Sequence, residues 1–220
     1  MSKYCADIPQ AVQGQYPART DGPIVLLTGS TGSIGSNILA SLLSERKVVQ
    51  IYALSRQSTT EDRRLRTAFE DRSLPVSLLD DSRLSILVGD VTQPNWALDK
   101  AQYDEVQYSL PLYYSALRGA IQVLSSVTHI VHNAWTINFN LPLSSYEAQI
   151  SGVRSLVNVC ANAPQSIQII FTSSIGVATG WDVSKGPVPE RILDDPEVAV
   201  ASGYTASKYV SEQVHNATWL

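Results

Sequence analysis

The glycine-rich stretch Ile24–Leu39 most constrains what this chain can fold into. The apolar run Ile24–Leu27 predicts a short strand buried on both faces, and a helical pattern begins directly after the glycines. Between them, Gly29 allows a tight turn, Gly32 close approach of the backbone to a pyrophosphate, and Gly35 close helix-to-strand packing. Free N–H groups at the helix start attract an anion, so the stretch predicts a dinucleotide-binding turn. A glycine triplet alone is a weak signal, and a plain glycine-rich turn is the alternative.

Strand and helix patterns alternate along the rest of the chain. We expect strands at Ile24–Thr28, Val48–Ser55, Leu84–Gly89, Val127–His132 and Ile167–Ser173, and helices at Ser36–Leu43, Glu61–Phe69, Tyr108–Ser126, Pro142–Asn162 and Ser202–His215. This alternation predicts an α/β fold with a Rossmann-type, doubly wound parallel sheet. Residues 1–22 are expected to be an irregular arm or linker, residues 23–220 the nucleotide-binding domain, and Asp182–Pro196 a surface loop.

Composition and charge argue against some classes of binding partner. The chain has 220 residues, of which 44% are hydrophobic and 16% charged, so it can bury a full core. A net charge of −4 provides no basic field for nucleic acid or an anionic membrane. Cys5 and Cys160 lie far apart and predict neither a disulfide framework nor a metal site. No apolar run reaches about 18 residues and no signal core is present, so we expect neither secretion nor a membrane span, and a cytoplasmic location. The sequence leaves the oligomeric state open, with a monomer as the first expectation.

Arg56 follows the second expected strand, 27 residues after Gly29. At this place in a dinucleotide fold a carboxylate binds the ribose 2′-hydroxyl of NAD, whereas a cation accommodates the 2′-phosphate of NADP. A guanidinium can grip a phosphate through two parallel N–H bonds, so Arg56 predicts NADPH. Arg63, Arg64 and Arg66 could supply a second cation, or could form a solvated helix face.

Two other strand ends carry polar or small residues. Asp90, in the run G-D-V-T, could accept a hydrogen bond from an adenine amino group or cap the following turn. Asn133 and Ala134 follow the fourth strand, where small residues let the chain pass close to a bound cofactor.

The last strand and helix hold a candidate for proton transfer. Ser174 follows the fifth strand, and Tyr204 and Lys208 lie four residues apart at the start of the last helix. Because residues four apart share a helix face, the Lys208 ammonium can favour ionisation of the Tyr204 phenol, as a general acid at neutral pH requires. Ser174 could hold a carbonyl oxygen that gains charge during reduction.

These residues together resemble the extended short-chain dehydrogenase/reductase superfamily. The motifs are T-G-S-T-G-S-I-G from Thr28, G-D-V from Gly89, S-S from Ser173 and Y-T-A-S-K from Tyr204. The run V-H-N-A-W followed by N-F-N-L-P-L-S-S-Y and G-V-R is similar to the thioester reductase branch. That branch comprises the terminal reductase domains of carboxylic acid reductases, aminoadipate reductases and fungal adenylate-forming or peptide-synthetase-like enzymes.

The resemblance implies NADPH-dependent reduction of an acyl thioester held on the phosphopantetheine arm of a carrier domain, with release of an aldehyde, or of an alcohol after a second hydride transfer. It assigns proton donation to Tyr204, lowering of the tyrosine pKa and binding of the nicotinamide ribose to Lys208, and the oxyanion to Ser174. The expected cofactor-binding residues are Thr28, Gly29, Ser30, Thr31, Gly32, Ser33, Ile34, Gly35, Arg56, Arg66, Asp90, Val91, Asn133, Ala134, Trp135, Tyr204 and Lys208.

Two departures from the family leave alternatives open. Gln149 stands where many members have Asn, so its role is undetermined, and the C-terminal substrate lobe of the family is missing after Leu220. We therefore expect a fragment that could bind cofactor without turning over substrate. The alternatives are an extended reductase, epimerase or dehydratase acting on a free small molecule, and a cofactor-binding module without catalysis.

Overall fold

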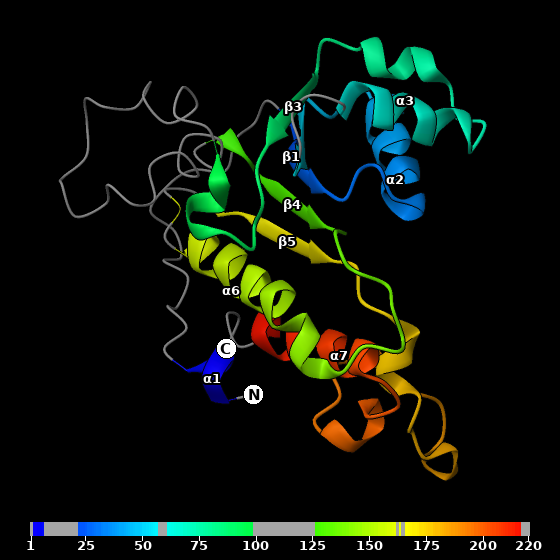
Figure 1. Ribbon diagram of the computed structural model, residues 1–220, viewed down its shortest axis with the longest axis vertical. Coiled ribbons are helices and arrows are strands. Elements are labelled where there is room, and N and C mark those ends of the chain that lie inside the picture. The colour runs from blue at the N-terminus through cyan, green and yellow to red at the C-terminus, as the bar shows by residue number, and fades with distance from the viewer. Residues whose placement is uncertain are drawn as a thin grey trace, which may run out of the picture. The chain divides into compact units, whose positions relative to one another are not determined.

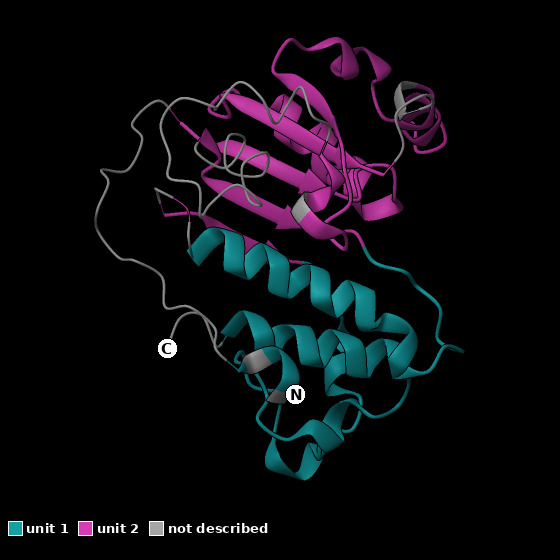
Figure 2. Ribbon diagram, turned by 60° about the vertical axis from the view of Figure 1, so that its left-hand side comes forward, with its two compact units in different colours: residues 1–11, 135–161, 172–220 teal, residues 12–134, 162–171 magenta. Residues whose placement is uncertain are grey.

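The computed structural model describes residues 2–6, 22–56, 61–98, 126–161, 163 and 166–216 (Figure 1). The chain divides into two compact units (Figure 2). Unit 1 comprises residues 1–11, 135–161 and 172–220, and unit 2 comprises residues 12–134 and 162–171. Apart from Ser126, the helix expected at Tyr108–Ser126 lies outside the described residues. The expected domain boundary at residue 23 stays a prediction.

Unit 2 contains a parallel sheet of five strands in the order β3-β2-β1-β4-β5. The strands are β1 (Ile24–Thr28), β2 (Gln50–Ser55), β3 (Leu84–Val88), β4 (His129–His132) and β5 (Gln168–Phe171). This topology confirms the predicted Rossmann-type α/β fold. The strand order reverses at β1, which has β2 on one side and β4 on the other. In open α/β sheets, ligands bind beyond the carboxyl ends of the strands at such a reversal.

The core of unit 2 lies between the sheet and two helices, α2 (Ser33–Ser44) and α3 (Glu61–Glu70), seen on the same side of the sheet in Figure 1. Every residue of β1 is buried, as expected for the central strand of a parallel sheet. Leu27 of β1, Leu39 of α2 and Phe69 of α3 are fully buried in one cluster. Packing of this cluster therefore fixes α2, and with it the glycine turn, against β1. The 3₁₀ turns of this unit are η1 (Val76–Asp80) and η2 (Pro94–Ala97).

Arg83 holds the C-terminal end of α2. Its Nη1 donates to the carbonyl oxygens of Glu45 at 2.9 Å and Val48 at 2.8 Å, and its Nη2 donates to that of Leu43. The last carbonyl groups of a helix have no partner within the helix, so this guanidinium supplies a donor to Leu43 in the last turn and to Glu45 at the C-cap. Hydrogen bonds from Arg83 also lower the pKa of Asp81, which orients the guanidinium.

Unit 1 is built on two helices, α6 (Glu147–Ala161) and α7 (Gly203–Asn216), which pack together (Figure 2). A single turn, α1 (Ser2–Cys5), lies within the segment expected to be irregular. Short 3₁₀ turns complete the unit: η4 (Leu143–Tyr146), η5 (Ile175–Ala178), η6 (Val183–Lys185) and η7 (Pro196–Ala199). The predicted loop Asp182–Pro196 therefore contains η6 and the first residue of η7.

The expected element boundaries differ from the observed ones at several ends. α2 begins at Ser33 rather than Ser36, because Gly35 lies inside the first helical turn. β2 begins at Gln50 rather than Val48, although Val48 is 4% exposed in the core. The helix expected from Pro142 is interrupted, since η4 precedes α6. Apolar patterns mark burial, and they do not distinguish a strand end from a buried loop residue.

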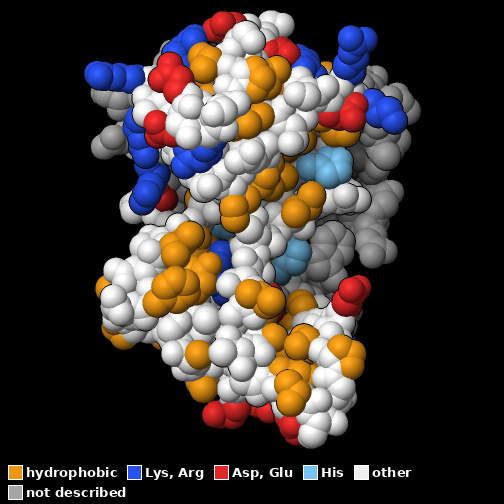
Figure 3. All heavy atoms as spheres, turned by 90° about the vertical axis from the view of Figure 1, so that its right-hand side faces the viewer, with side chains coloured by type: hydrophobic (Ala, Val, Ile, Leu, Met, Phe, Trp, Pro, Cys, Tyr) orange, Lys and Arg blue, Asp and Glu red, His pale blue; other side chains and the backbone are white. Residues whose placement is uncertain are grey.

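The surface carries charges of both signs. On the face drawn in Figure 3, Lys and Arg side chains are interspersed with Asp and Glu side chains. None of the helices that the structure describes has the length and apolarity needed to cross a bilayer.

Candidate active site

The glycine turn of unit 2 has the steric properties expected from the sequence at two of its three glycines. Gly29 has φ = +75°, and a Cβ there would lie 2.8 Å from the backbone of Ala134. A Cβ at Gly35 would lie 1.9 Å from the carbonyl oxygen of Gly29. Gly32 is different, because its φ is −76° and the nearest atom to a Cβ would be at 3.4 Å. The fold itself therefore tolerates a side chain at Gly32.

The Thr28 hydroxyl joins the end of β1 to the end of β4. Its oxygen accepts from the backbone N–H of Asn133 at 3.1 Å and of Ala134 at 3.0 Å, and it bonds His132 Nδ1 at 2.8 Å. Thr28 is 2% exposed, so these bonds engage a buried hydroxyl. The contribution of Thr28 is therefore to position the turn, and it brings Asn133 and Ala134 against Gly29.

Two observations show that this turn suits an anionic dinucleotide. Ser30 is 1% exposed, and its Oγ has no hydrogen-bond partner among the described residues. Gly32 is the N-cap of α2, and it has no side chain that could bond the first N–H groups of this twelve-residue helix. Those N–H groups and the Ser30 hydroxyl can be satisfied by phosphate oxygens, which a helix N-terminus attracts.

The other predicted nucleotide contacts in unit 2 have different surroundings. Arg56 is exposed directly after β2. Arg66 forms an ion pair with Asp80 at 2.7 Å, whereas Asp90 accepts from the backbone and hydroxyl of Thr92 at 2.9 and 2.7 Å. Asp90 thus has the turn-capping role that the sequence left as one of two alternatives. Val91 is 7% exposed and packs inside the unit.

Tyr204 and Lys208 lie one turn apart on α7 of unit 1, and they are 8% and 2% exposed. Lys208 Nζ donates to the carbonyl oxygen of Thr172 at 2.6 Å and lies 4.1 Å from the centre of the Trp135 ring. The Trp135 Nε1–H donates to Ser207 Oγ at 3.3 Å. Trp135, which was predicted to bind cofactor, therefore contacts the lysine side chain through a cation–π interaction.

Burial makes the Lys208 charge unstable. Desolvation lowers the pKa of Lys208 from 10.5 to about 7, and the carboxylate of Glu212 partly offsets this. Burial thus disfavours the ammonium form that the sequence predicts for Lys208. Burial also raises the pKa of Glu212. Sequence reasoning missed Glu212, although its place four residues after Lys208 on the same helix was a usable signal.

Aromatic side chains surround the Tyr204 ring. Phe139 contacts it edge-on, with ring centres 5.0 Å apart, and Tyr146 lies at 6.3 Å in a similar orientation. Tyr146 is fully buried, and its hydroxyl donates to the carbonyl oxygen of Asn138 at 2.5 Å. The same cluster includes Ile150 of α6, so both α6 and the 138–146 segment fix the position of the phenol ring.

Ser174 caps the turn η5 next to α7. Its Oγ accepts from the backbone N–H of Gly176 at 3.1 Å, which leaves the hydroxyl hydrogen able to donate. A Cβ at Gly176 would lie 2.6 Å from Cγ2 of Thr205, so this turn packs tightly against the residue after Tyr204. Unit 1 therefore contains all three predicted catalytic residues.

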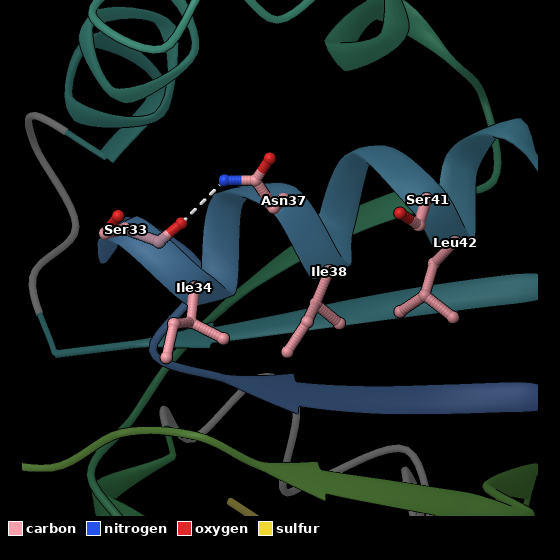
Figure 4. Close-up of a pocket in the computed structure, with 6 residues that line it drawn as sticks. All are labelled: Ser33, Ile34, Asn37, Ile38, Ser41 and Leu42. Atoms are coloured by element: carbon pink, nitrogen blue, oxygen red, sulfur yellow. Dashed lines mark hydrogen bonds between the residues drawn. The ribbon is translucent and has the colours of Figure 1, made fainter.

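A shallow groove runs along α2 of unit 2 (Figure 4). Its volume is about 550 Å³, and its lining residues are Ser33, Ile34, Asn37, Ile38, Ser41 and Leu42. None of these side chains is ionisable, so the groove offers no group for acid–base chemistry. Ile34 is 56% exposed and lines this groove, and its predicted nucleotide contact stays a prediction.

Gln149 makes a hydrogen bond within unit 1, from Nε2 to Thr136 Oγ1 at 2.9 Å. This contact ties α6 to the segment after Trp135. Among the residues that the structure describes, no group of three His, Cys, Asp or Glu side chains could hold a metal ion.

The parallel sheet and the glycine turn of unit 2 define a nucleotide-binding α/β protein. The chain belongs to the NAD-binding family described as male sterility protein (NAD_binding_4), whose profile matches residues 27–112 and 118–219. Its family therefore establishes a nicotinamide nucleotide as the cofactor class.

Named relatives share much of this chain. It is 41% identical over 197 residues to adenylate-forming reductase Nps11 of Serpula lacrymans, covering 87% of the chain and 16% of the relative. It is 32% identical over 214 residues to a carboxylic acid reductase of Neurospora crassa, covering 97% of the chain and 18% of the relative. The chain thus spans less than a fifth of the length of either protein.

Solved structures confirm the fold. The terminal R domain from the myxalamid PKS-NRPS pathway superimposes with a TM-score of 0.75 at 24% identity, over 97% of this chain and 50% of that one. The R domain of a non-ribosomal peptide synthetase from Mycobacterium tuberculosis gives 0.62 at 21% identity, over 96% and 46%.

Substitutions at two glycines of the turn distinguish a residue that the fold requires from one that ligand binding requires. We expect Gly32→Ala to unfold at the same urea concentration as the parent, because its Cβ meets nothing closer than 3.4 Å. The same variant should bind dinucleotide at least about tenfold more weakly, since the methyl group occupies the path of the phosphates. Gly35→Ala should instead lower the free energy of unfolding by ~1–3 kcal/mol. Loss of stability in Gly32→Ala, or unchanged binding, would contradict this assignment.

The burial of Lys208 predicts a pH dependence of stability. Between about pH 7 and 10.5 the unfolded chain holds a proton on Lys208 that the folded chain has released, so this group favours folding as pH rises. Lys208→Met should therefore reduce the slope of unfolding free energy against pH, by up to ~1.4 kcal/mol per unit. Urea unfolding at pH 7, 8 and 9 measures it, with the exposed Lys185→Met as control. An unchanged slope would show that Lys208 is charged in the folded state.

Proposed function

We propose that this chain is the nucleotide-binding and proton-transfer part of a thioester reductase, which uses NADPH to release a carrier-bound acyl group as an aldehyde. The observation that carries the proposal is the Tyr204–Lys208 pair, buried on one helix beside the Ser174 turn. Adenylate-forming and carboxylic acid reductases among its relatives support this reaction over the reduction of a free sugar or steroid.

Each catalytic residue of unit 1 has a distinct task. A bound nicotinamide nucleotide supplies the hydride. The Ser174 hydroxyl donates a hydrogen bond to the thioester oxygen, whose negative charge grows as its carbon is reduced. Tyr204 gives its phenolic proton to that oxygen, which completes a hemithioacetal. Lys208, with a pKa near neutrality, can return a proton to the phenolate.

Product release then needs only one bond to break. When the hemithioacetal collapses, its carbon–sulfur bond breaks with the electron pair staying on sulfur, and the aldehyde is freed. The hydroxyl proton passes through Tyr204 to the Lys208 amine, since a residue that acts as an acid in one direction acts as a base in the other. The phosphopantetheine thiolate takes up a proton from solvent. An alcohol forms if the aldehyde is reduced a second time by the same residues.

Unit 2 is proposed to hold the nucleotide through the glycine turn. The backbone of Gly29 to Ile34, the Ser30 hydroxyl and the start of α2 would bind the pyrophosphate. Arg56 would bind the 2′-phosphate of NADPH, because it is exposed beyond β2. Arg66 is a weaker candidate, since Asp80 already pairs with it.

The partner is proposed to be a carrier domain that bears the acyl thioester. One of the structures with this fold is a thiolation-reductase di-domain from an archaeal non-ribosomal peptide synthetase, with a TM-score of 0.59 at 16% identity. A reducing, cytoplasmic setting fits the thiol of Cys160, which burial keeps protonated by raising its pKa to about 12.

Nucleotide preference tests the role of Arg56. Calorimetric titration should show the parent binding NADPH much more tightly than NADH. Arg56→Ala should weaken NADPH binding about 10- to 100-fold and leave NADH binding unchanged, because a charge-assisted phosphate contact is lost. Arg46→Ala, which removes another exposed arginine from unit 2, is the matched control. Equal affinity of the parent for both nucleotides would refute this part of the proposal.

Removal of the phenol tests the chemistry. In the complete reductase protein, Tyr204→Phe should slow reduction of an acyl-pantetheine thioester by about 10²–10⁴-fold, because a positioned proton donor is lost. Tyr209→Phe, which deletes a hydroxyl from the same helix in a different apolar cluster, should keep most of the activity. A Tyr204→Phe rate equal to that of the parent would indicate a cofactor-binding module without this catalytic role.

A further inference from the structure

The N-terminal residues Lys3, Tyr4 and Ala6 are bound to α6 within unit 1. Tyr4 OH donates to Glu147 Oε1 at 2.9 Å, and Lys3 Nζ donates to the same oxygen. Arg154 Nη1 donates to the carbonyl oxygens of Tyr4 and Ala6, at 2.7 Å each. Glu147 and Arg154 are seven residues apart, so they lie on one side of α6, two turns from each other.

Both ends of this contact have a local physical reason. Glu147 is the first residue of α6, where the helix dipole favours a carboxylate, and hydrogen bonds from Lys3 and Tyr4 lower its pKa. α1 is a single turn, so its last carbonyl groups need a partner from outside. Arg154 supplies that partner, and Asn158 Oδ1 holds its Nε at 2.8 Å. Helix α6 therefore binds residues 3–6 through their backbone carbonyl groups as well as through their side chains.

The same segment reaches the apolar cluster of the proposed proton donor. The half-buried Tyr4 ring packs against the cluster formed by Tyr146, Ile150 and Tyr204. Ile150 lies on α6 between Glu147 and Arg154, so the ring is placed between the two charged contacts. Residues 3–6 are therefore attached to the unit that carries the catalytic side chains, through polar bonds at both ends and an apolar contact in the middle.

We propose that Glu147 and Arg154 form an anchor for residues 3–6, and that this anchor sets the point from which a carrier domain on the N-terminal side presents its thioester to Tyr204. A tether with a fixed end confines the carrier to a small volume and so raises its effective concentration at the site. The anchor residues are positioning residues, because they touch the tether and not the reacting atoms. This inference rests on the proposed function.

The test compares two forms of one substrate in the complete reductase protein. The acyl group is supplied either on the attached carrier domain or as a free acyl-pantetheine thioester. Arg154→Ala should lower the single-turnover rate with the attached carrier by about tenfold and leave kcat/KM for the free thioester unchanged. Arg154→Lys, which keeps the charge and a donor, should restore part of the loss. Arg191→Ala, which removes a surface ion pair with Asp194 in the same unit, is the matched control.

A second variant distinguishes loss of the anchor from a general loss of structure caused by Arg154→Ala. Tyr4→Phe combined with Glu147→Gln removes the phenol donor and the carboxylate charge at the other end of the anchor while leaving Arg154 in place. It should give the same selective loss. Equal losses on both substrates, or no loss with the attached carrier, would overturn the anchor. If the unaltered protein reduces neither substrate, the proposed function itself has failed.

Limited proteolysis tests whether residues 3–6 are bound to α6, and it does not require an assay of reductase activity. Trypsin cuts the Lys3–Tyr4 bond only when residues 3–6 leave α6, because a helical, bound segment does not fit a protease. Cleavage followed by mass spectrometry should be about tenfold faster in Arg154→Ala than in the parent, and unchanged in Arg191→Ala. Equal cleavage rates in all three proteins would show that residues 3–6 are not held by Arg154.

Discussion

The close approach of two strand ends in unit 2 is the constraint on which nucleotide binding depends. A Cβ at Gly29 would lie 2.8 Å from the Ala134 backbone, and the Thr28 hydroxyl bonds the N–H groups of the two residues after β4. This contact places the turn at the reversal of strand order, with the N-terminus of α2 directly behind it. The N–H groups at the start of the helix and the buried Ser30 hydroxyl are donors that an anion can satisfy.

Unit 1 depends instead on a buried amine. Lys208 loses hydration, so its position is fixed by the Thr172 carbonyl, the Trp135 ring and the charge of Glu212. A lysine whose pKa is lowered towards neutrality gives up its proton more readily than an exposed lysine does. The desolvation that destabilises the charged amine therefore also gives Lys208 the lowered pKa that its proposed role in proton transfer uses.

Helix α6 connects the tether contact with the phenol of α7. Glu147 and Arg154 face residues 3–6, while Ile150 between them packs in the cluster that holds Tyr204. The same helix therefore supports the Tyr204 ring through Ile150 and binds residues 3–6 through Glu147 and Arg154. In a multidomain reductase this arrangement would make delivery of the acyl group depend on the structure of the catalytic unit.

The sequence by itself determined the parallel α/β fold, the glycine turn and the Tyr204–Lys208 spacing, because helix and strand periodicity and glycine sterics act over a few residues. Tertiary structure decided the rest: Asp80 pairs with Arg66, the Trp135 ring of unit 1 contacts the Lys208 amine, and α1 binds α6. These contacts join residues 14 to 150 positions apart. Only packing of the whole chain brings such residues together, so no local pattern can specify them.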